Sequence, residues 1–357
     1  MATTIYVVST QRFSGKTALC VGLIRWLKAE GLSAGYMKPV STTARKRGES
    51  TSDEDALFIK SIMDLPDPLD AIAPVLLSES GLDAALSTGA GEELEMKVLD
   101  ALGRIGKGRD AVVMEGGTSL REGHIVRLDT PRLSRLLKTN VLVVAPFSDT
   151  VQVVDDLLAA RSLVSDTLIG CVINQVPQHR IAFVEEKVRP FIEAQSIPVF
   201  AVLPREKTLM SVSVDELREG LGGEVLCCES AMGELVENLM IGAMGIETAL
   251  SYFRLAMNKA VITGSDRSDI QLAALETSTR CLILTGDARP SPLVVGIAEE
   301  RNVPIILTRL DTLKAVEILE TFFGKTRFHQ QKKIDRFEKL LDKSMDFKAL
   351  KRALGLA

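Results

Sequence analysis

Residues 5–17 read Ile5-Tyr6-Val7-Val8-Ser9-Thr10-Gln11-Arg12-Phe13-Ser14-Gly15-Lys16-Thr17. An apolar, β-branched run passes into a loop that ends in Gly-Lys-Thr, and leucines recur at helical spacing in the following stretch, 18–30. This order of strand, loop and helix is typical of a phosphate-binding loop. Backbone N–H groups at the helix start face the phosphates, Lys16 supplies a positive charge, and Thr17 offers a hydroxyl to magnesium. We therefore expect a nucleotide site here.

The loop departs from the usual pattern at its upstream end. The pattern has a glycine where this chain has Thr10, and a loop one residue longer would have it at Ser9. Glycine permits backbone angles that serine and threonine adopt less readily. A degenerate loop that keeps the fold but no longer binds nucleotide is therefore an alternative, although Gly15, Lys16 and Thr17 are retained.

Length and composition indicate a soluble protein of two or three domains. The chain has 357 residues, of which 46% are hydrophobic, and a formal net charge of −4 gives no overall attraction to nucleic acid or anionic membranes. Five cysteines without metal-type spacing suit a reduced, cytoplasmic protein, and Cys20, Cys171 and Cys281 are expected in the core. Strand structure begins by Thr3 and no apolar run is long enough for a membrane span, so we expect neither a signal peptide nor membrane insertion.

Further polar residues follow apolar strands. Lys38 ends the short strand at 33–40, and Glu115 ends a buried strand that is followed by two glycines, as in phosphate-loop proteins whose second acidic strand organises magnesium. Asn174 ends the strand at 167–177. The carboxyl ends of parallel strands form the ligand crevice of an open α/β sheet. Lys38 is therefore expected beside the phosphate loop, with a surface lysine as the alternative, whereas Asp55 is either a site residue or part of ordinary helix capping.

Strands alternate with helices as far as residue 204, which predicts a doubly wound, mostly parallel α/β domain. Within it, His124–Arg127 is expected to form a short strand. The composition changes near Gly222, and the remainder predicts a second, smaller α/β domain in which 233–240 is helical. Its polar turns at 263–269 and 285–289 either line a ligand cleft or cap helices.

The last segment is basic, with ten Lys or Arg against four Asp or Glu between Lys325 and Arg352. Its apolar residues recur at helical spacing, so we expect a helical tail that docks on the body of the protein or on a sister subunit. Nucleic-acid binding is less favoured because no aromatic stacking platform accompanies the charge. The predicted domains are thus 1–222, 223–324 and 325–357.

Several of these segments occur in the same order in dethiobiotin synthetase, which the N-terminal half resembles. They are the loop at 14–17, Gly35–Val40, Asp55–Leu57, Glu115–Gly117 and Ile173–Val176. Residues 259–320, with Gly264-Ser265-Asp266-Arg267-Ser268-Asp269-Ile270-Gln271, resemble a DRTGG domain. The pairing is similar to the N-terminal region of long phosphate acetyltransferases and to stand-alone proteins of that type.

The resemblance implies roles for individual residues. Lys16 and Lys38 would contact the phosphates of ATP as the catalytic pair, and Asn174 would read the adenine edge. Thr17, Asp55 and Glu115 would organise Mg²⁺. The nucleotide-binding set is Thr10, Ser14, Gly15, Lys16, Thr17 and Asn174. The stretch 73–87 lacks the Ser-Pro-His segment expected in an amine-substrate pocket, and nothing after Leu307 resembles an acetyltransferase catalytic domain.

Three functions follow as hypotheses. The first is a Mg-ATP-binding regulatory or sensor protein, a homodimer whose DRTGG-like domain binds a second small ligand. The second is a ligase or synthetase that uses ATP to activate a carboxylate or carbamate, with the lysines and magnesium stabilising the transferred phosphoryl group. The third is an assembly subunit with a degenerate loop.

Overall fold

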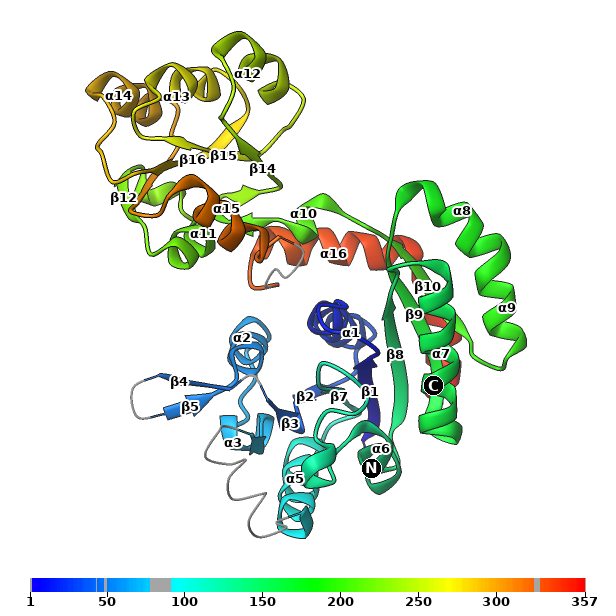
Figure 1. Cartoon of the computed structure of the whole chain (residues 1–357). Helices are drawn as coiled ribbons and strands as arrows, with labels where there is room; N and C mark the ends of the chain where they lie inside the picture. Colours follow the sequence, from blue (N-terminus) through cyan, green and yellow to red (C-terminus); the bar gives the residue numbers. More distant parts are fainter. Residues whose placement is uncertain (1, 43, 48–49, 78–90, 324–327, 357) are drawn as a thin grey trace. The chain divides into compact units, whose positions relative to one another are not determined.

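The computed structural model describes residues 2–42, 44–47, 50–77, 91–323 and 328–356 (Figure 1). Parts of the predicted polar loop (43, 48–49), of the 73–87 stretch (78–87) and of the basic tail (325–327) lie outside these residues. The chain forms two compact units. Unit 1 comprises Met1–Arg205 and Phe328–Ala357, and unit 2 comprises Glu206–Arg327. The polypeptide therefore leaves unit 1 after Arg205 and returns to it at Phe328.

Unit 1 is built on a six-stranded sheet in the order β10-β9-β8-β1-β7-β2. All neighbouring strands are parallel, which confirms the predicted doubly wound sheet. The strands are β1 (Thr3–Ser9), β2 (Ala34–Met37), β7 (Ala111–Glu115), β8 (Asn140–Pro146), β9 (Leu168–Val176) and β10 (Val199–Pro204). Because helices cover both faces, β7 is buried along its whole length and reads as a continuous apolar run.

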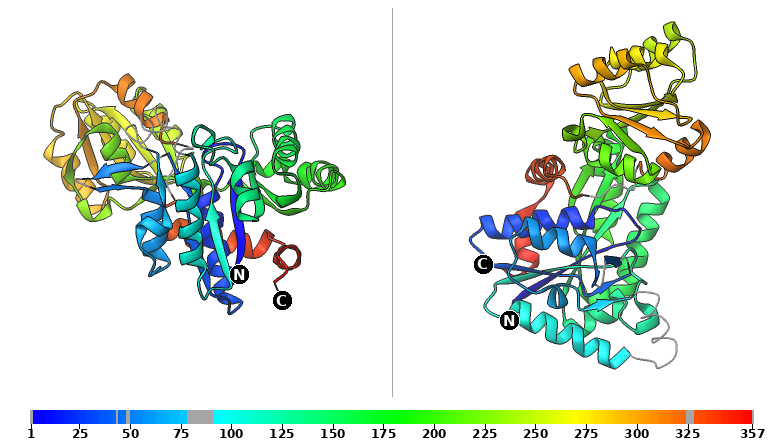
Figure 2. Two further views of the ribbon diagram at one scale, coloured as in Figure 1. Left: turned by 90° about the horizontal axis from the view of Figure 1, so that it is seen from below. Right: turned by 90° about the vertical axis from the view of Figure 1, so that its left-hand side faces the viewer.

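The helices of unit 1 form a layer on each side of the sheet (Figure 2). One layer shares a single apolar core with the sheet and contains α5 (Gly91–Gly106), α6 (Thr130–Leu137), α7 (Thr150–Val164), α8 (Ile181–Phe183) and α9 (Arg189–Ala194). The opposite layer contains α1 (Lys16–Ala29) and α16 (Gln331–Ser344). Next to β2 lie α2 (Glu54–Ile62) and α3 (Leu69–Ile72). Two short ladders complete the unit, β3 (Val40–Ser41) with β6 (Val75–Leu76) and β4 (Arg45–Arg47) with β5 (Ser50–Ser52).

The strand predicted at His124–Arg127 is wrong, since His124–Val126 forms a short 3₁₀ helix. The preceding Gly123 has a φ of 88°, and its carbonyl accepts hydrogen bonds from the amides of Val126 and Leu128 at 3.0 Å. These local bonds close a tight turn, so the backbone groups of this segment are satisfied without a neighbouring strand.

Unit 2 is a second, smaller α/β unit with a five-stranded sheet in the order β12-β17-β16-β15-β14. Only β12 is antiparallel to its neighbour among these strands. The strands are β12 (Glu224–Cys227), β14 (Asn238–Ile241), β15 (Lys259–Gly264), β16 (Thr279–Thr285) and β17 (Ile305–Thr308). One face is covered by α12 (Ile246–Phe253), α13 (Ser268–Leu275) and α14 (Pro292–Glu300), and the other by α11 (Val214–Leu221) and α15 (Thr312–Glu320).

Two sequence interpretations change in unit 2. The predicted helix at 233–240 is wrong: β13 (Leu235–Val236) pairs with β11 (Val212–Ser213), and β14 forms the sheet edge beside β15. Backbone pairing thus decides the conformation of a short apolar run whose periodicity is ambiguous. The stretch 206–222, assigned from composition to the first domain, packs with unit 2, because Val214 and Leu217 of α11 lie in the core beneath β15 and β16.

The C-terminal tail is helical and packs on unit 1. Ile334, Phe337 and Leu341 of α16 are buried, as the apolar spacing predicts. Trp26 of α1 stacks on Phe347, the first residue of α17 (Phe347–Ala353), with ring centroids 5.0 Å apart. Within the described part of the chain, every helix is too short or too polar to cross a bilayer.

Candidate functional site

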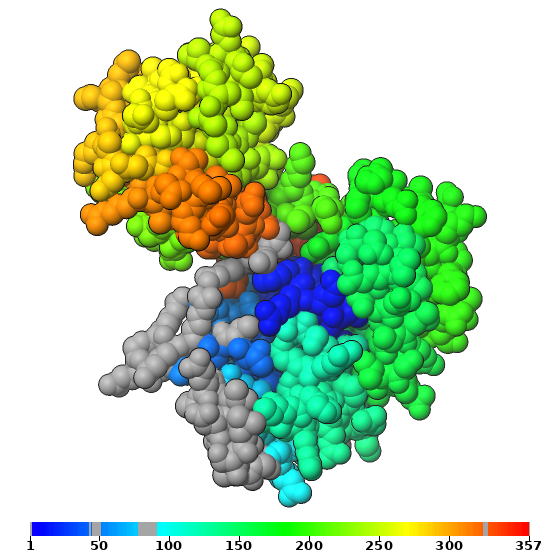
Figure 3. Space-filling view, in the orientation of Figure 1, coloured from blue at the N-terminus to red at the C-terminus, as the bar shows by residue number. Residues whose placement is uncertain are grey.

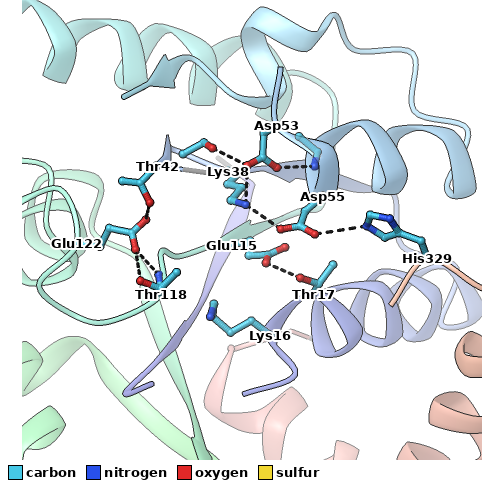
Figure 4. A network of polar contacts seen from close by, with 12 residues as sticks. Lys16, Thr17, Lys38, Thr42, Asp53, Asp55, Glu115, Thr118, Glu122 and His329 are labelled. Atoms are coloured by element: carbon cyan, nitrogen blue, oxygen red, sulfur yellow. Dashed lines mark hydrogen bonds and ion pairs between the residues drawn. The ribbon is translucent and has the colours of Figure 1, made fainter. Parts of the chain in front are cut away.

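The predicted site residues gather where β1, β2 and β7 end, at one edge of the unit 1 sheet (Figure 4). This edge is the ligand crevice of doubly wound folds. Lys16 and Thr17 begin α1, Lys38 follows β2, Glu115 ends β7, and Asp55 lies in the first turn of α2. In the space-filling view the N-terminal segment, dark blue, reaches the surface of unit 1 (Figure 3), and Phe13 in the loop is 49% exposed. Part of the phosphate loop is therefore exposed to solvent.

The loop from Ser9 to Gly15 has the properties of an anion-binding loop. Gly15 has a φ of 91°, a left-handed conformation that only glycine adopts without strain. It precedes α1, whose N-terminus has no side-chain cap and no acidic residue in its first turn. The helix start thus presents unpaired N–H groups and a positive dipole end. The hydroxyls of Thr10 and Ser14 are buried and, among the described residues, without a hydrogen-bond partner. Buried unpaired donors of this kind fit phosphate oxygens.

Ser9, one of the two residues that stand where the pattern has glycine, makes hydrogen bonds within the loop. The Lys16 ammonium donates a hydrogen bond to Ser9 Oγ at 2.8 Å, and Ser9 Oγ donates to the carbonyl of Gln11 at 2.8 Å. Lys16 is buried, and this desolvation lowers its pKa although Glu115 acts in the opposite direction. A phosphate group would place a negative charge directly against this buried ammonium.

Thr17 and Glu115 form the candidate magnesium position. Thr17 Oγ1 donates to Glu115 Oε1 at 2.7 Å, and Tyr36 OH donates to Glu115 Oε2 at 2.8 Å. Glu115 is 2% exposed, and its burial raises its pKa despite the nearby lysines. Adjacent oxygens in an octahedral magnesium site lie about 3 Å apart. The hydroxyl and the carboxylate therefore fit two neighbouring ligand positions.

Lys38 is held by two carboxylates. Its Nζ lies 2.8 Å from Asp53 Oδ2 and 3.0 Å from Asp55 Oδ2. Burial opposes the charge on Lys38, but Asp55, Glu115 and Asp53 together outweigh it and raise its pKa. Burial also opposes the charge on Asp55, yet its contacts with His329 and Lys38 lower its pKa. The two shifts keep Lys38 and Asp55 charged at neutral pH.

Asp53 is a site residue that sequence reasoning treated only as a helix cap. It does cap α2, because its Oδ1 accepts the amide of Ala56 at 2.9 Å. Its Oδ2 accepts Ser41 Oγ at 2.5 Å as well as Lys38. The signal was present, since a capping aspartate two residues before Asp55 presents a second carboxylate at the same helix end.

The amide residues after β9 contact the loop itself. Asn174 Nδ2 donates to the carbonyl of Ser14 at 2.8 Å, and Asn174 Oδ1 accepts the amide of Gln175 at 2.8 Å. Gln175 Nε2 donates to the carbonyl of Phe13 at 2.8 Å. Each polar group of the Asn174 amide retains one further hydrogen-bonding position. Asn174 therefore supports the loop in this structure, and its predicted contact with adenine stays a prediction.

The sequence did not indicate Glu122, which lies on the other side of the site. Its Oε1 accepts Thr42 Oγ1 at 2.6 Å, and its Oε2 accepts the amide and the hydroxyl of Thr118. A Cβ on Gly117 would lie 2.5 Å from Cδ of Glu122, so glycine allows this close approach. Among the described residues, no group of three or more His, Cys, Asp or Glu side chains is placed to hold a metal ion by itself. A magnesium ion here would therefore take most of its ligands from phosphate and water.

Two family models match the chain. One, described as an AAA domain, matches residues 3–213, and one, described as a DRTGG domain, matches residues 216–322. Phosphate acetyltransferase of Nitratidesulfovibrio vulgaris is 23% identical over 366 aligned positions, which cover 97% of this chain and 51% of that protein. The chain thus spans about half the length of the phosphate acetyltransferases it matches.

Two further proteins are similar to parts of the chain. ATP-dependent dethiobiotin synthetase of Caldicellulosiruptor saccharolyticus is 29% identical over 75 residues, or 21% of this chain and 31% of that protein. A solved structure of the CBS and DRTGG domains of Clostridium perfringens pyrophosphatase, complexed with its activator diadenosine tetraphosphate, aligns with 43% of this chain and 73% of that chain. Its TM-score is 0.30 and its sequence identity is 16%.

Proposed function

Because this chain belongs to the AAA-domain family, as a dethiobiotin-synthetase-like P-loop protein followed by a DRTGG domain, we propose that it binds Mg-ATP and acts as a regulatory or sensor protein. The observation that carries the proposal is the loop around Gly15. It combines an uncapped helix N-terminus, the buried Lys16 and the unpaired hydroxyls of Thr10 and Ser14. Each of these groups is suited to phosphate oxygens.

In this proposal Thr17 and Glu115 hold the magnesium ion and Asp55 faces it, directly or through water. Magnesium, when bound with the nucleotide, neutralises the charge of the phosphates. Lys16 moves from Ser9 Oγ to the phosphates, and Lys38 contributes a second positive charge from the other side of Glu115. Asn174 supports the loop and directs its remaining N–H toward the base.

A regulatory role is supported by the combination of domains more than by any single residue. The region that matches phosphate acetyltransferases covers about half of those proteins. We assign no acetyl transfer to this chain. A second small ligand in unit 2, a homodimer and a cytoplasmic location belong to the same proposal. The five cysteines are all free thiols, which suits a reducing compartment.

The experiment is calorimetric titration of ATP with and without magnesium, together with an assay of phosphate release on the same sample. Micromolar, magnesium-dependent binding, about −8 kcal/mol, is expected. Lys16→Ala should weaken it by about 1.5–3 kcal/mol, because charge-assisted hydrogen bonds to the phosphates are lost. Lys97→Ala is the matched control, since the Lys97 side chain is 52% exposed on α5.

Each outcome of the titration has a definite meaning. Binding that is unchanged by Lys16→Ala would refute the loop as the nucleotide site. Phosphate release that depends on a small acid or amine would favour an ATP-dependent ligase over a sensor. Absence of ATP binding to the wild-type protein would leave assembly as the role of unit 1.

A further inference from the structure

His329 lies beside the nucleotide site although it is distant from it in the sequence. Phe328 is the first residue of unit 1 after unit 2, so His329 sits where the polypeptide returns. Its ring stacks on Phe58 of α2, with centroids 4.4 Å apart and an angle of 27° between the planes. Its Nε2 is buried and faces Asp55 Oδ1 at 3.5 Å (Figure 4). The returning segment therefore contacts both Asp55 and the helix that carries it.

The two oxygens of Asp55 have different partners. Oδ2 accepts the ammonium of Lys38 at 3.0 Å, and Oδ1 faces His329. The Asp55 side chain is 35% exposed. A partly exposed carboxylate in the first turn of a helix has several accessible rotamers. Contacts on both oxygens select one of them, and in that rotamer the carboxylate points along the line between Lys38 and His329.

Packing contacts on several sides hold His329 in its position. Phe328 packs edge-on against Phe337 of α16, with ring centroids 5.7 Å apart. The same part of α16 is tied to α1, since Arg25 Nη1 lies 2.5 Å from Glu338 Oε1, and the adjacent Phe337 is buried. The Phe58 ring covers one face of the imidazole. The imidazole is thus held between α2 and the segment that leads into α16.

We propose that His329 is a positioning residue that orients Asp55 for the magnesium ion of the bound nucleotide. The proposal rests on the Mg-ATP function proposed above and assigns a residue of the returning segment to the magnesium position. With its proton on Nε2, the imidazole donates to Asp55 Oδ1 and fixes the carboxylate for the ion or its water shell. Partners that orient a ligating carboxylate commonly contribute 10- to 100-fold to metal affinity.

The test compares the magnesium dependence of ATP binding in four full-length proteins, the wild type and the variants His329→Ala, His329→Gln and His179→Ala. We expect His329→Ala to raise the magnesium concentration needed for half-maximal ATP binding by about tenfold. Binding of ATP without magnesium should stay unchanged. Glutamine keeps an N–H donor at similar reach, so His329→Gln should restore most of the loss. His179 is exposed in the turn after β9 and serves as the control.

A second readout follows the returning segment itself. Hydrogen exchange of the first amides of α16, residues 331–335, should slow when Mg-ATP is added to the wild type, and this protection should be absent in His329→Ala. Equal loss of ATP affinity with and without magnesium would indicate a purely structural role and overturn the proposal. So would a His329→Ala variant that matches the wild type in both readouts. If the wild type binds no ATP, the proposed function fails first, and the positioning role fails with it.

Discussion

Replacing Lys38 by methionine removes the positive charge between two carboxylates while keeping most of the side-chain volume. Lys38 Nζ lies 2.8 Å from Asp53 Oδ2, and the two side chains are only 6% and 0% exposed, respectively. Asp53 also accepts Ser41 Oγ and the amide of Ala56, so it is fixed in place. In Lys38→Met this carboxylate stays buried but loses its lysine partner, and the folded state must carry the desolvation cost of that loss.

The expected loss is large for a single substitution. Removing one partner of a buried ion pair costs about 3–5 kcal/mol. The Asp55 contact adds little, because that side chain is 35% exposed and such pairs contribute at most about 1 kcal/mol. We therefore expect Lys38→Met to lower the free energy of unfolding by about 3–5 kcal/mol in the absence of nucleotide. Asp53→Asn added to it should recover part of the loss, since asparagine is uncharged and still caps α2.

Urea denaturation followed by far-UV circular dichroism measures this difference. Lys97→Met is the matched control, because the Lys97–Glu93 pair is exposed and its loss should leave the free energy of unfolding nearly unchanged. A loss below about 1 kcal/mol for Lys38→Met would refute the reasoning. It would mean that water reaches Asp53 when the lysine is absent.

The pH dependence of the same difference follows from the two pKa shifts. Because the pKa of Lys38 is raised in the folded state, protonated Lys38 contributes stability below about pH 10.4. This contribution is lost as the pH rises through the folded-state pKa. Because the pKa of Asp55 is lowered in the folded state, ionised Asp55 contributes stability above about pH 3.9. This contribution is lost as the pH falls through the folded-state pKa. The difference in the free energy of unfolding between wild type and Lys38→Met should thus be constant near neutral pH and become smaller in acid.

Two further predictions concern the loop and Glu115, the carboxylate proposed to bind magnesium. Gly15→Ala should destabilise unit 1 by about 2–3 kcal/mol, from left-handed strain and from displacing Asn174, whose Nδ2 would lie 2.5 Å from the new Cβ. Gly31→Ala has positive φ but open space, so the same denaturation assay should show only the strain, about 1 kcal/mol. Equal losses would contradict the clash with Asn174. For Glu115, burial raises the pKa, so the folded state binds the proton more tightly and wild-type stability falls as the pH rises from about 4.3. Glu115→Gln should lack that fall, and parallel stability curves between pH 4 and 8 would disprove it.

The phosphate loop, the parallel sheet and the gathering of Lys16, Lys38 and Glu115 were predictable for one physical reason. Each of these residues follows or ends a strong apolar strand, and parallel strands bring their carboxyl ends to one edge. Local patterns of apolar residues were therefore enough to predict that these residues lie at one edge of the sheet. The positions were predictable in this way, whereas the roles of these residues in binding stay predictions.

The remaining features depend on contacts that local sequence does not encode. His329 lies in a basic, weakly patterned segment, and its contact with Asp55 arises only because the chain returns to unit 1 after another whole unit. Glu122 contacts Thr42, and it directly precedes the turn at Gly123 and the short 3₁₀ helix that replaces the strand expected at His124–Arg127. The short strand β14 was read as part of a helix, because pairing with β15 rather than periodicity decides its conformation.

The close packing of α16 on α1 has a consequence for how the protein is made. A Cβ on Gly22 would lie 2.2 Å from Cδ1 of Leu341, so the two helices pack closely at this glycine and a larger residue would displace the leucine side chain. Residues 328–357 are synthesised after all of unit 2. The nascent P-loop unit therefore emerges from the ribosome with the apolar surface of α1 bare, and it stays so while the following residues are translated. The contact of His329 with Asp55 in the candidate site thus forms only after unit 2 has been translated, and chaperones that bind exposed apolar helices have that interval in which to act.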